Sequence, residues 1–140
     1  AYEIRLSPVG SEMCIRDSWN TSDETRAWSQ KFYERRKAMP SSLQAADYSA
    51  ALQYLRAVKA TGTDDADRVL AYLRENKLND LYIKDGVVRP DGRVVHDMYL
   101  LQVKTPAESK APWDYFNVVQ TIDGNEAFTT KAESRCALWK

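Results

Sequence analysis

The amino-acid sequence predicts an α/β fold in which three helices come first and several strands follow. In three stretches before residue 77 the apolar residues recur at helical spacing, and turn or capping residues separate these stretches. Beyond residue 80 apolar and polar residues alternate, as they do in strands, and Pro90, Asp91 and Gly92 predict a turn. A chain of 140 residues can bury enough surface for one hydrophobic core.

The first helix is expected over residues 21–36. Thr21 and Glu24 form a capping-box pattern, in which the hydroxyl and the carboxylate each satisfy a free backbone N–H group. Trp28 and Phe32 are four residues apart, so they share one face of this helix, and charged residues supply the opposite face.

The second helix is expected over residues 43–60. Gly62 follows as its predicted C-terminal cap, because glycine adopts the left-handed conformation at little cost. Several small residues would let this helix pack closely against a neighbour. Its inward face is predicted from five residues at helical spacing: Tyr48, Ala51, Leu52, Leu55 and Val58.

The third helix is expected to follow residues 63–65 and to end near Asn76. The carboxylates of Asp64 and Asp65 suit the positive end of a helix dipole. The predicted inward residues of this helix are Ala66, Val69, Leu70 and Leu73.

Strands are expected at residues 81–83, 86–89, 94–104 and 115–122. The strand over residues 94–104 carries apolar residues on both faces, so we expect other parts of the protein to cover both faces. The tail from residue 123 is polar and is predicted to be irregular.

The charge composition argues against a nucleic-acid partner. The 20 lysines and arginines balance the 20 aspartates and glutamates, so there is no positive excess to attract a phosphate backbone. No apolar stretch approaches the roughly 18 residues that a membrane-spanning helix needs.

The sequence shows no catalytic or metal-binding constellation, so we predict no enzymatic activity, no metal and no cofactor. His96 and Asp97 are adjacent on an expected strand and point to opposite faces, which favours a structural or surface histidine. Asp64, Asp65 and Asp67 are interpreted as helix-capping residues and not as calcium ligands.

The chain contains two cysteines, Cys14 and Cys136, and we expect no disulfide between them. Cys136 is either an ordinary thiol or half of a disulfide whose partner lies outside this sequence. The second alternative fits an oxidising compartment.

Residues 9–18 resemble the translation of a sequencing adapter, because they contain the run Met-Cys-Ile-Arg-Asp. We therefore expect residues 1–18 to be non-native and exclude them from functional argument. The alternative is a genuine N-terminal strand at residues 2–6, closed by a turn at residues 7–10.

Several phrases of the remaining sequence resemble the type 1 periplasmic solute-binding proteins of ABC importers, in the branch that binds branched-chain amino acids. The resemblance covers residues 19–140 and implies the C-terminal third of a protein with two α/β lobes. It implies helices packed on a largely parallel sheet, together with an antiparallel hairpin. The phrases include Thr-Arg-Ala-Trp-Ser-Gln-Lys-Phe-Tyr at 25–33, Leu-Gln-Ala-Ala-Asp-Tyr-Ser-Ala at 43–50 and Pro-Trp-Asp-Tyr at 112–115.

The resemblance implies a non-catalytic receptor in the periplasm, with an export signal upstream of this sequence. Such a receptor captures a small polar solute, for example a branched-chain amino acid or an amide, and delivers it to an ABC permease of the inner membrane. The part of the family's site that maps here is the start of the second helix, so the predicted ligand-binding residues are Leu43, Gln44 and Tyr48. Alternatively, Gln44 caps the helix and Tyr48 fills the core.

Two other functions are left open by the sequence. The same fold serves as the ligand-sensing input domain of receptors and regulators, which continue into a membrane helix or an effector domain. The chain could also be a small self-contained α+β interaction module, which would unfold cooperatively by itself.

Overall fold

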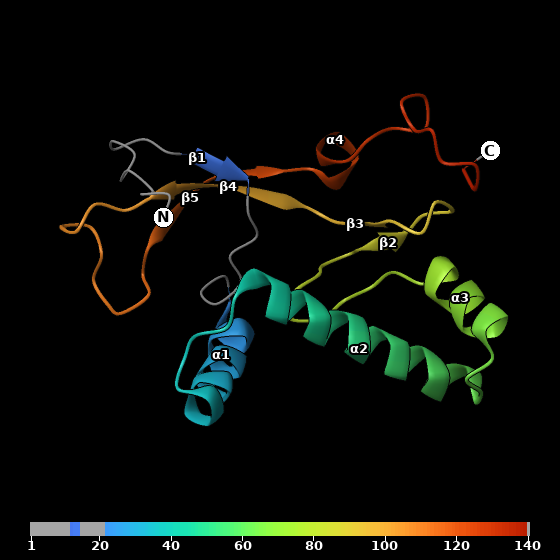
Figure 1. The fold of residues 1–140 in the computed structure, drawn as a ribbon, viewed down its shortest axis with the longest axis horizontal. Coiled ribbons are helices and arrows are strands. Elements are labelled where there is room, and N and C mark those ends of the chain that lie inside the picture. Colours follow the sequence, from blue (N-terminus) through green and yellow to red (C-terminus); the bar gives the residue numbers. More distant parts are fainter. Residues whose placement is uncertain (1–11, 15–21, 140) are drawn as a thin grey trace, which may run out of the picture.

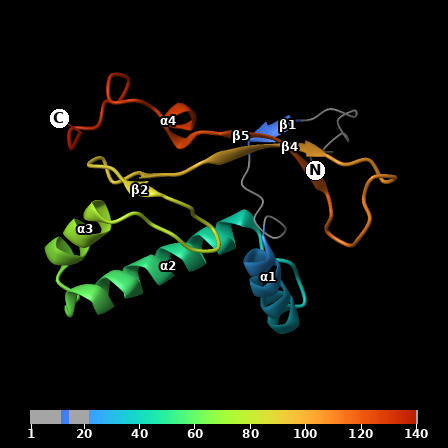
Figure 2. The same ribbon diagram turned by 180° about the vertical axis from the view of Figure 1, so that it is seen from behind.

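The structure of the chain is a computed structural model that describes residues 12–14 and 22–139. Figures 1 and 2 show a layer of three helices on one side and a layer of strands on the other. This arrangement confirms the predicted α/β class. The elements in chain order are β1 (Glu12–Cys14), α1 (Asp23–Arg36), α2 (Ser42–Thr61), α3 (Ala66–Glu75), β2 (Val87–Val88), β3 (Val94–Val95), β4 (Met98–Val103), β5 (Phe116–Ile122) and α4 (Gly124–Ala127).

The strands form a three-stranded sheet in the order β1-β4-β5 and a separate β2-β3 hairpin. Every strand pair in the described part of the chain is antiparallel, so the hairpin is confirmed but the described sheet is not largely parallel as expected. For the β2–β3 and β4–β5 pairs, the physical reason is that the two strands of each pair follow one another without an intervening helix. Short connections join antiparallel strands, whereas parallel neighbours need a long crossover.

Helix α1 begins slightly later than predicted, with Ser22 as its N-cap. The capping box consists of Ser22 and Thr25: the Ser22 N–H donates to Thr25 Oγ1 at 2.9 Å, and the Thr25 N–H donates to Ser22 Oγ at 3.2 Å. The predicted box of Thr21 and Glu24 is therefore wrong in its residues. Thr21 itself lies outside the described residues. The expected strand at residues 2–6 and most of residues 9–18 also lie outside them. A threonine can take the place of glutamate because its side-chain hydroxyl oxygen also accepts a hydrogen bond from the backbone N–H of the N-cap residue.

Helix α2 ends as predicted at Gly62, whose backbone is left-handed with φ of 68°. Its buried face differs from the prediction, because the apolar residues predicted inward are exposed or half-buried and Leu55 is 62% exposed. The buried face is built from small and polar residues because a loop packs closely against it and hydrogen-bonds to it. These residues are Ala45, Ser49, Gln53 and Ala57.

Helix α3 confirms the capping role of Asp65, whose carboxylate accepts a hydrogen bond from the Arg68 N–H at 3.0 Å. Of the four residues predicted to point inward, Val69 is buried, whereas Ala66 and Leu70 are exposed. The helix ends at Glu75, and Asn76 is its C-cap, as the sequence predicts.

The strand predicted at residues 81–83 is absent, and a loop occupies this position. The long strand predicted over residues 94–104 is interrupted at His96 and Asp97, which separate β3 from β4. The strand predicted at residues 115–122 is confirmed as β5. The tail predicted to be irregular contains the short helix α4.

The hydrophobic core is small and lies where α2, α3, the loop after α3 and the strands meet. Its buried apolar residues are Ala45, Ala57, Val69, Leu78, Ile83, Val95 and Leu101. Larger apolar side chains are exposed on α2 and β5, among them Leu43, Val118 and Val119. Much of the apolar surface of the described residues is therefore available for contact with other groups.

Candidate functional site

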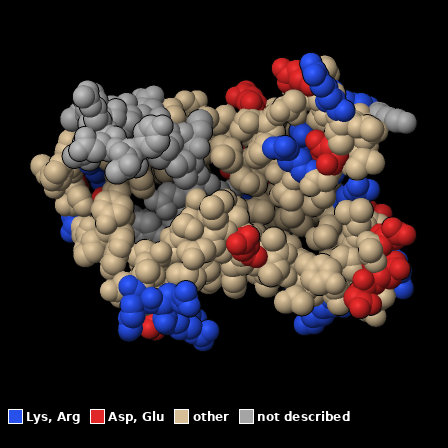
Figure 3. Space-filling view, viewed as in Figure 1, with Lys and Arg blue, Asp and Glu red and all other residues tan. Residues whose placement is uncertain are grey.

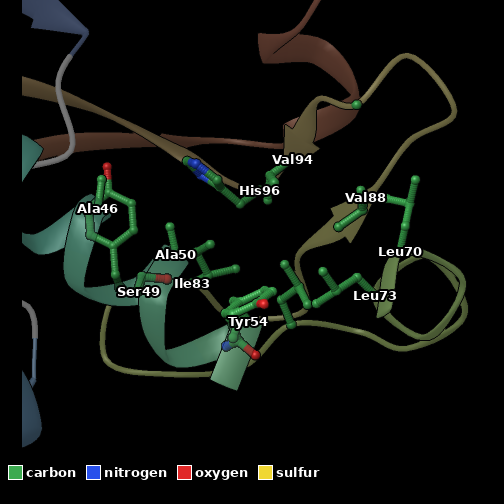
Figure 4. A pocket seen from close by; sticks show the side chains of 14 residues that line it. Ala46, Ser49, Ala50, Tyr54, Leu70, Leu73, Ile83, Val88, Val94 and His96 are labelled. Atoms are coloured by element: carbon green, nitrogen blue, oxygen red, sulfur yellow. The ribbon is translucent and has the colours of Figure 1, made fainter. Parts of the chain in front are cut away.

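A pocket of about 450 Å³ lies between α2, α3 and the β2-β3 hairpin. Figure 4 shows Ala46, Ala50 and Tyr54 of α2 facing Val88 and Val94 of the hairpin across this space. The volume is within the range of small-molecule sites. We call this space the apolar pocket, because most of its lining residues are hydrophobic.

The polar groups of the apolar pocket are largely engaged within the chain. Ser49 Oγ and Gln53 Nε2 both donate to Asp80 Oδ2, at 2.7 and 2.8 Å. The His96 ring lies edge-on to Tyr82 and Phe128, and its Nδ1 is 2.8 Å from the Asp97 carbonyl oxygen. The pocket therefore offers mainly apolar surface, which holds an apolar group but gives a polar solute little orientation.

The Asp80 carboxylate fastens the loop after α3 to the buried face of α2. Its second oxygen, Oδ1, accepts hydrogen bonds from the backbone N–H groups of Tyr82 at 2.7 Å and Ile83 at 2.9 Å. Partial burial acts to raise the pKa of Asp80, but the hydrogen bonds from Ser49, Ile83, Gln53 and Tyr82 outweigh burial and lower the pKa below its usual value. Asp80 is therefore a structural anchor that stays ionised.

A second hollow, of about 390 Å³, lies between α1 and α2, and we call it the α1–α2 groove. Three aromatic rings line it: the centroid of Trp28 is 5.6 Å from that of Phe32 and 5.2 Å from that of Tyr48. Its other lining residues are Lys31, Arg35 and Gln44. Figure 3 shows lysine and arginine side chains gathered over the lower end of α1.

A family model described as periplasmic binding protein matches residues 15–111, which is more than half of the chain. The chain belongs to the periplasmic binding protein family. This family consists of solute-binding proteins, and the α/β fold of the chain matches its type 1 structures.

Two crystal structures of periplasmic binding proteins are closely similar to the chain. A periplasmic binding protein from Burkholderia mallei is 52% identical with a TM-score of 0.90, and the match covers 94% of this chain and 35% of that one. A branched chain amino acid ABC transporter periplasmic ligand-binding protein from Burkholderia xenovorans is 46% identical with a TM-score of 0.88, over the same shares of the two chains.

A more distant structure shares the fold alone. It is the leucine-, isoleucine-, valine-, threonine- and alanine-binding protein from Brucella ovis, which is 16% identical with a TM-score of 0.63, over 85% of this chain and 32% of that one. The chain has no match among curated proteins. It spans about a third of the length of the periplasmic binding proteins whose structures it matches.

Two of the three predicted ligand-binding residues of this periplasmic binding protein lie in the α1–α2 groove. Gln44 caps α2, since its Oε1 accepts a hydrogen bond from the Ser41 N–H at 2.9 Å, and Tyr48 is 40% exposed against Trp28. Leu43 is 75% exposed and does not line the groove. A role in ligand binding stays a prediction for all three residues.

The sequence prediction missed the contribution of α1 to this groove. Trp28, Lys31, Phe32 and Arg35 follow the spacing i, i+3, i+4 and i+7, so one face of the helix carries all four. The pairing of Trp28 with Phe32 was predicted and is confirmed. The sequence signal was the charged and aromatic face of α1, but only the structure shows that this face meets α2.

The described part of this periplasmic binding protein offers no group of three histidine, cysteine or acidic residues that could hold a metal ion. Among the helices that the structure describes, none is both long and apolar enough to cross a membrane. Cys136 is an exposed free thiol, so a disulfide partner outside this sequence stays a prediction.

The C-terminal segment of the chain is held against the β2-β3 hairpin by Arg89. The Arg89 guanidinium forms an ion pair with Asp91 at 2.7 Å, donates to the Thr129 carbonyl oxygen at 2.9 Å and lies 3.9 Å from the centroid of the Trp139 ring. The hydrogen bonds and charge of Arg89 hold the pKa of Asp91 below its usual value, so the ion pair persists at neutral pH.

Replacing Arg89 with alanine is expected to release this segment without unfolding the rest of the protein. The segment contains Lys131 and Arg135, so trypsin should cut there roughly fivefold faster, as expected from the loss of about 1 kcal/mol of local contacts. Limited proteolysis followed by mass spectrometry measures the two cleavage rates. The control variant is Lys84→Ala, because Lys84 is an exposed lysine outside the C-terminal segment. Equal cleavage rates in Arg89→Ala and Lys84→Ala would contradict the role of Arg89.

Proposed function

We propose that the chain is part of the solute-binding component of an ABC importer. In this proposal the protein works in the periplasm, captures a small polar solute such as a branched-chain amino acid or an amide, and delivers it to a permease in the inner membrane. The observation that carries the proposal is the 46% identity, over 94% of the chain, to a branched chain amino acid ABC transporter periplasmic ligand-binding protein. No catalytic step and no cofactor belong to this function.

The proposed mechanism is ligand-driven closure of two lobes around the solute. A ligand shifts an equilibrium between open and closed states only by the difference between its affinities for the two states. The residues proposed to contribute from this chain are Leu43, Gln44 and Tyr48, of which Gln44 and Tyr48 line the α1–α2 groove. The upstream residues of the complete protein would contribute the remaining contacts.

The first experiment establishes the length of the natural protein. The source DNA is amplified and sequenced across codon 19, because we propose that residues 1–18 are non-native and that the reading frame continues upstream to an export signal. A genomic sequence that reproduces residues 1–18 would overturn this division of the chain.

The second experiment tests solute binding with the full-length gene product. Isothermal titration calorimetry with leucine, isoleucine, valine and simple amides is expected to give saturable binding of at least one solute. Tyr48→Ala should weaken that binding about tenfold or more, in the range found for buried aromatic contacts at binding sites. Tyr54→Ala is the matched control, because Tyr54 is a similarly exposed tyrosine of α2 that lines the apolar pocket.

The binding results for the two tyrosine variants show whether the solute binds in the α1–α2 groove or in the apolar pocket. If Tyr54→Ala weakens binding and Tyr48→Ala does not, the solute binds in the apolar pocket and the proposed site is wrong. If no solute in the series binds to a folded full-length product, the proposed function is wrong for this class of solutes.

A further inference from the structure

Trp113 has a strained backbone in the last turn of the loop between β4 and β5. Its φ is 66°, in the left-handed region, and the Asp114 N–H donates to the Ala111 carbonyl oxygen at 3.2 Å across Pro112 and Trp113. A turn with proline at its second position and a positive φ at its third normally carries glycine at the third. A bulky residue there is a conformational outlier, and such strain persists only where the surroundings over-determine it. Contacts of the loop must therefore hold Trp113 in place.

Two contacts of Lys104 close the base of this loop. Its backbone N–H donates to the Tyr115 carbonyl oxygen at 2.7 Å, and its ammonium group forms an ion pair with Asp114 Oδ1 at 2.6 Å. The side chains of this ion pair are only 16% and 12% exposed, so salt and water screen it less than a surface pair. Asp114 Oδ2 also accepts a hydrogen bond from the Lys110 N–H at 3.1 Å. These contacts fix the residue that directly follows Trp113.

Asp114 stays ionised at neutral pH, so the ion pair persists. The hydrogen bond from the Lys104 ammonium lowers the pKa of Asp114 below its usual value, and the hydrogen bond from the Lys110 N–H lowers it further. Burial acts in the opposite direction but is outweighed.

The Trp113 ring contacts Tyr33 of α1. The two ring centroids are 4.9 Å apart and the rings meet edge-on, at an angle of 60°. We call β4, β5 and the loop that connects them the β4–β5 ribbon. Figures 1 and 2 show this loop, in orange, turning from the strands toward α1. The contact therefore joins the tip of the β4–β5 ribbon to the layer of helices.

The other end of the β4–β5 ribbon is where the chain enters and leaves it. Asp97 directly precedes β4, Gly124 follows β5 closely, and the Gly124 N–H donates to Asp97 Oδ1 at 3.2 Å. Two crossings of the backbone thus join the ribbon to the rest of the chain at this base. A change of angle at the base moves the tip furthest, so the ring contact of Trp113 with Tyr33 opposes such a change.

The ring contact at the tip can form and break because its two states are close in free energy. An edge-on aromatic pair stabilises by an amount of the same order as the strain of a bulky residue at positive φ. Both rings belong to half-buried residues, so water can cover them when they separate. The base of the loop remains closed by Lys104 in either state, so breaking the ring contact does not unfold the loop.

We propose that Trp113 and Tyr33 form a reversible latch between the β4–β5 ribbon and α1. The ion pair of Lys104 with Asp114 keeps the Trp113 ring in position for the latch to close. The closed latch is assigned to the closed state of the complete protein, because it draws two parts of the chain together. This assignment to the closed state rests on the solute-binding function proposed above, whereas the latch itself rests on the contacts of the loop.

Electron paramagnetic resonance measures the latch as the distance between two spin labels in the full-length gene product. The labels are attached at two exposed positions, Arg36→Cys on α1 and Ala107→Cys on the loop, in a background without other reactive cysteines, where Cys136→Ser is one of the replacements. With Tyr33 and Trp113 intact we expect two distance populations, of which the shorter is dominant. Trp113→Ala should lower the ratio of the short to the long population about three- to tenfold, as for the loss of one aromatic pair.

Further variants distinguish a latch from a general effect on the fold. Tyr115→Ala is the matched control, because Tyr115 is an exposed aromatic residue at the end of the same loop and its ring lies against Phe116. Trp113→Phe keeps an aromatic edge and should keep most of the short population. Tyr33→Ala should match Trp113→Ala, and the double variant should lower the ratio no further, because both substitutions remove the same contact. Circular dichroism verifies that each variant is folded.

Asp114→Asn tests the positioning role of the ion pair. This variant should lower the ratio of the short to the long population while Trp113 is present. It should have no effect in the Trp113→Ala background, because the ion pair acts on the latch only through the ring. An unchanged ratio in Asp114→Asn would contradict the positioning role.

The distance and calorimetry results separate the latch from the proposed function. If Trp113→Ala leaves the distance distribution unchanged, or if Tyr115→Ala changes it as much, the latch is wrong, whichever solute binds. If the distances change as expected and none of the amino acids and amides titrated above binds, the latch stands and the solute-binding function is wrong. If one of these solutes binds, Trp113→Ala should weaken its binding by up to the same factor as the population ratio falls. An unchanged affinity would overturn the assignment of the latch to the closed state.

Discussion

Replacing Asp80 with alanine is expected to lower the free energy of unfolding by about 2–4 kcal/mol, a large fraction of a typical domain's stability. The carboxylate accepts four hydrogen bonds, from the side chains of Ser49 and Gln53 and from the backbone N–H groups of Tyr82 and Ile83. Ser49 and Gln53 are only 1% and 8% exposed, so their donors would lose their acceptor where water cannot replace it.

Urea unfolding of the full-length gene product measures this effect. Asp47→Ala is the matched control, because Asp47 is an exposed aspartate of α2, the helix that carries Ser49 and Gln53. Its removal should change the unfolding free energy by no more than about 0.5 kcal/mol. Ser49→Ala should have an intermediate effect, since it removes one of the four hydrogen bonds. Equal stability of the Asp80 and Asp47 variants would contradict the anchoring role.

The stability supplied by Asp80 should depend on pH in a defined direction. Its pKa in the folded protein is lower than the ordinary value of 3.8, so the contribution is fully present above that value. As the pH falls below about 4, the unfolded chain binds a proton before the folded protein does, and the advantage is lost. The wild type should therefore lose more stability than Asp80→Asn between pH 7 and pH 3, and parallel losses would contradict this assignment.

Local signals in the sequence predicted the positions of helices α1 to α3 well, because short-range interactions determine where these helices begin and end. The cap at Gly62 and the role of Asp65 at the start of α3 depend only on nearby residues, and both are confirmed. The N-terminal cap of α1 was misplaced by one residue, because adjacent hydroxyl residues, Thr21 and Ser22, compete for that position. Local chemistry identifies such a cap but does not choose between equivalent neighbours.

The buried face of α2 could not be predicted from its apolar spacing, because a distant loop determines it. Asp80 recruits Ser49 and Gln53, which lie 31 and 27 positions earlier in the chain, and this contact turns the small-residue face of α2 inward. Leu55 is therefore exposed, although its spacing is typical of a core position. Long-range polar contacts of this kind leave no periodic signal in the sequence.

The predicted ligand-binding residues Leu43, Gln44 and Tyr48 were chosen because the family resemblance maps the start of α2 to the ligand site. Gln44 and Tyr48 line the α1–α2 groove and Leu43 does not, and a role in ligand binding stays a prediction for all three. The cations Lys31 and Arg35 lie on a different helix, and only the packing of α1 beside α2 brings them to the same hollow. A sequence pattern identifies residues that share one helix face but cannot show which neighbouring helix that face meets.

Replacing Gly124 with alanine is expected to lower the free energy of unfolding by about 1–3 kcal/mol, the usual cost of inserting a methyl group into a packed site. A Cβ at this position would lie 2.8 Å from Val95 Cγ1 and 2.9 Å from both the carbonyl carbon and the carbonyl oxygen of His96. The side chain of Val95 could rotate away, but the backbone of His96 lies between β3 and β4 and has little freedom to move.

The contact around Gly124 also holds the end of β5 to the break between β3 and β4. The Gly124 N–H donates to Asp97 Oδ1 at 3.2 Å, so a shift that relieves the clash would stretch this hydrogen bond. Urea unfolding compares Gly124→Ala with Glu126→Ala, an exposed position of the same short helix where the change should be no more than about 0.5 kcal/mol. The double variant Gly124→Ala, Val95→Ala should recover little of the loss, because the backbone of His96 remains in the way. Full recovery would show that the clash lies with the valine side chain and that the backbone at the strand break yields.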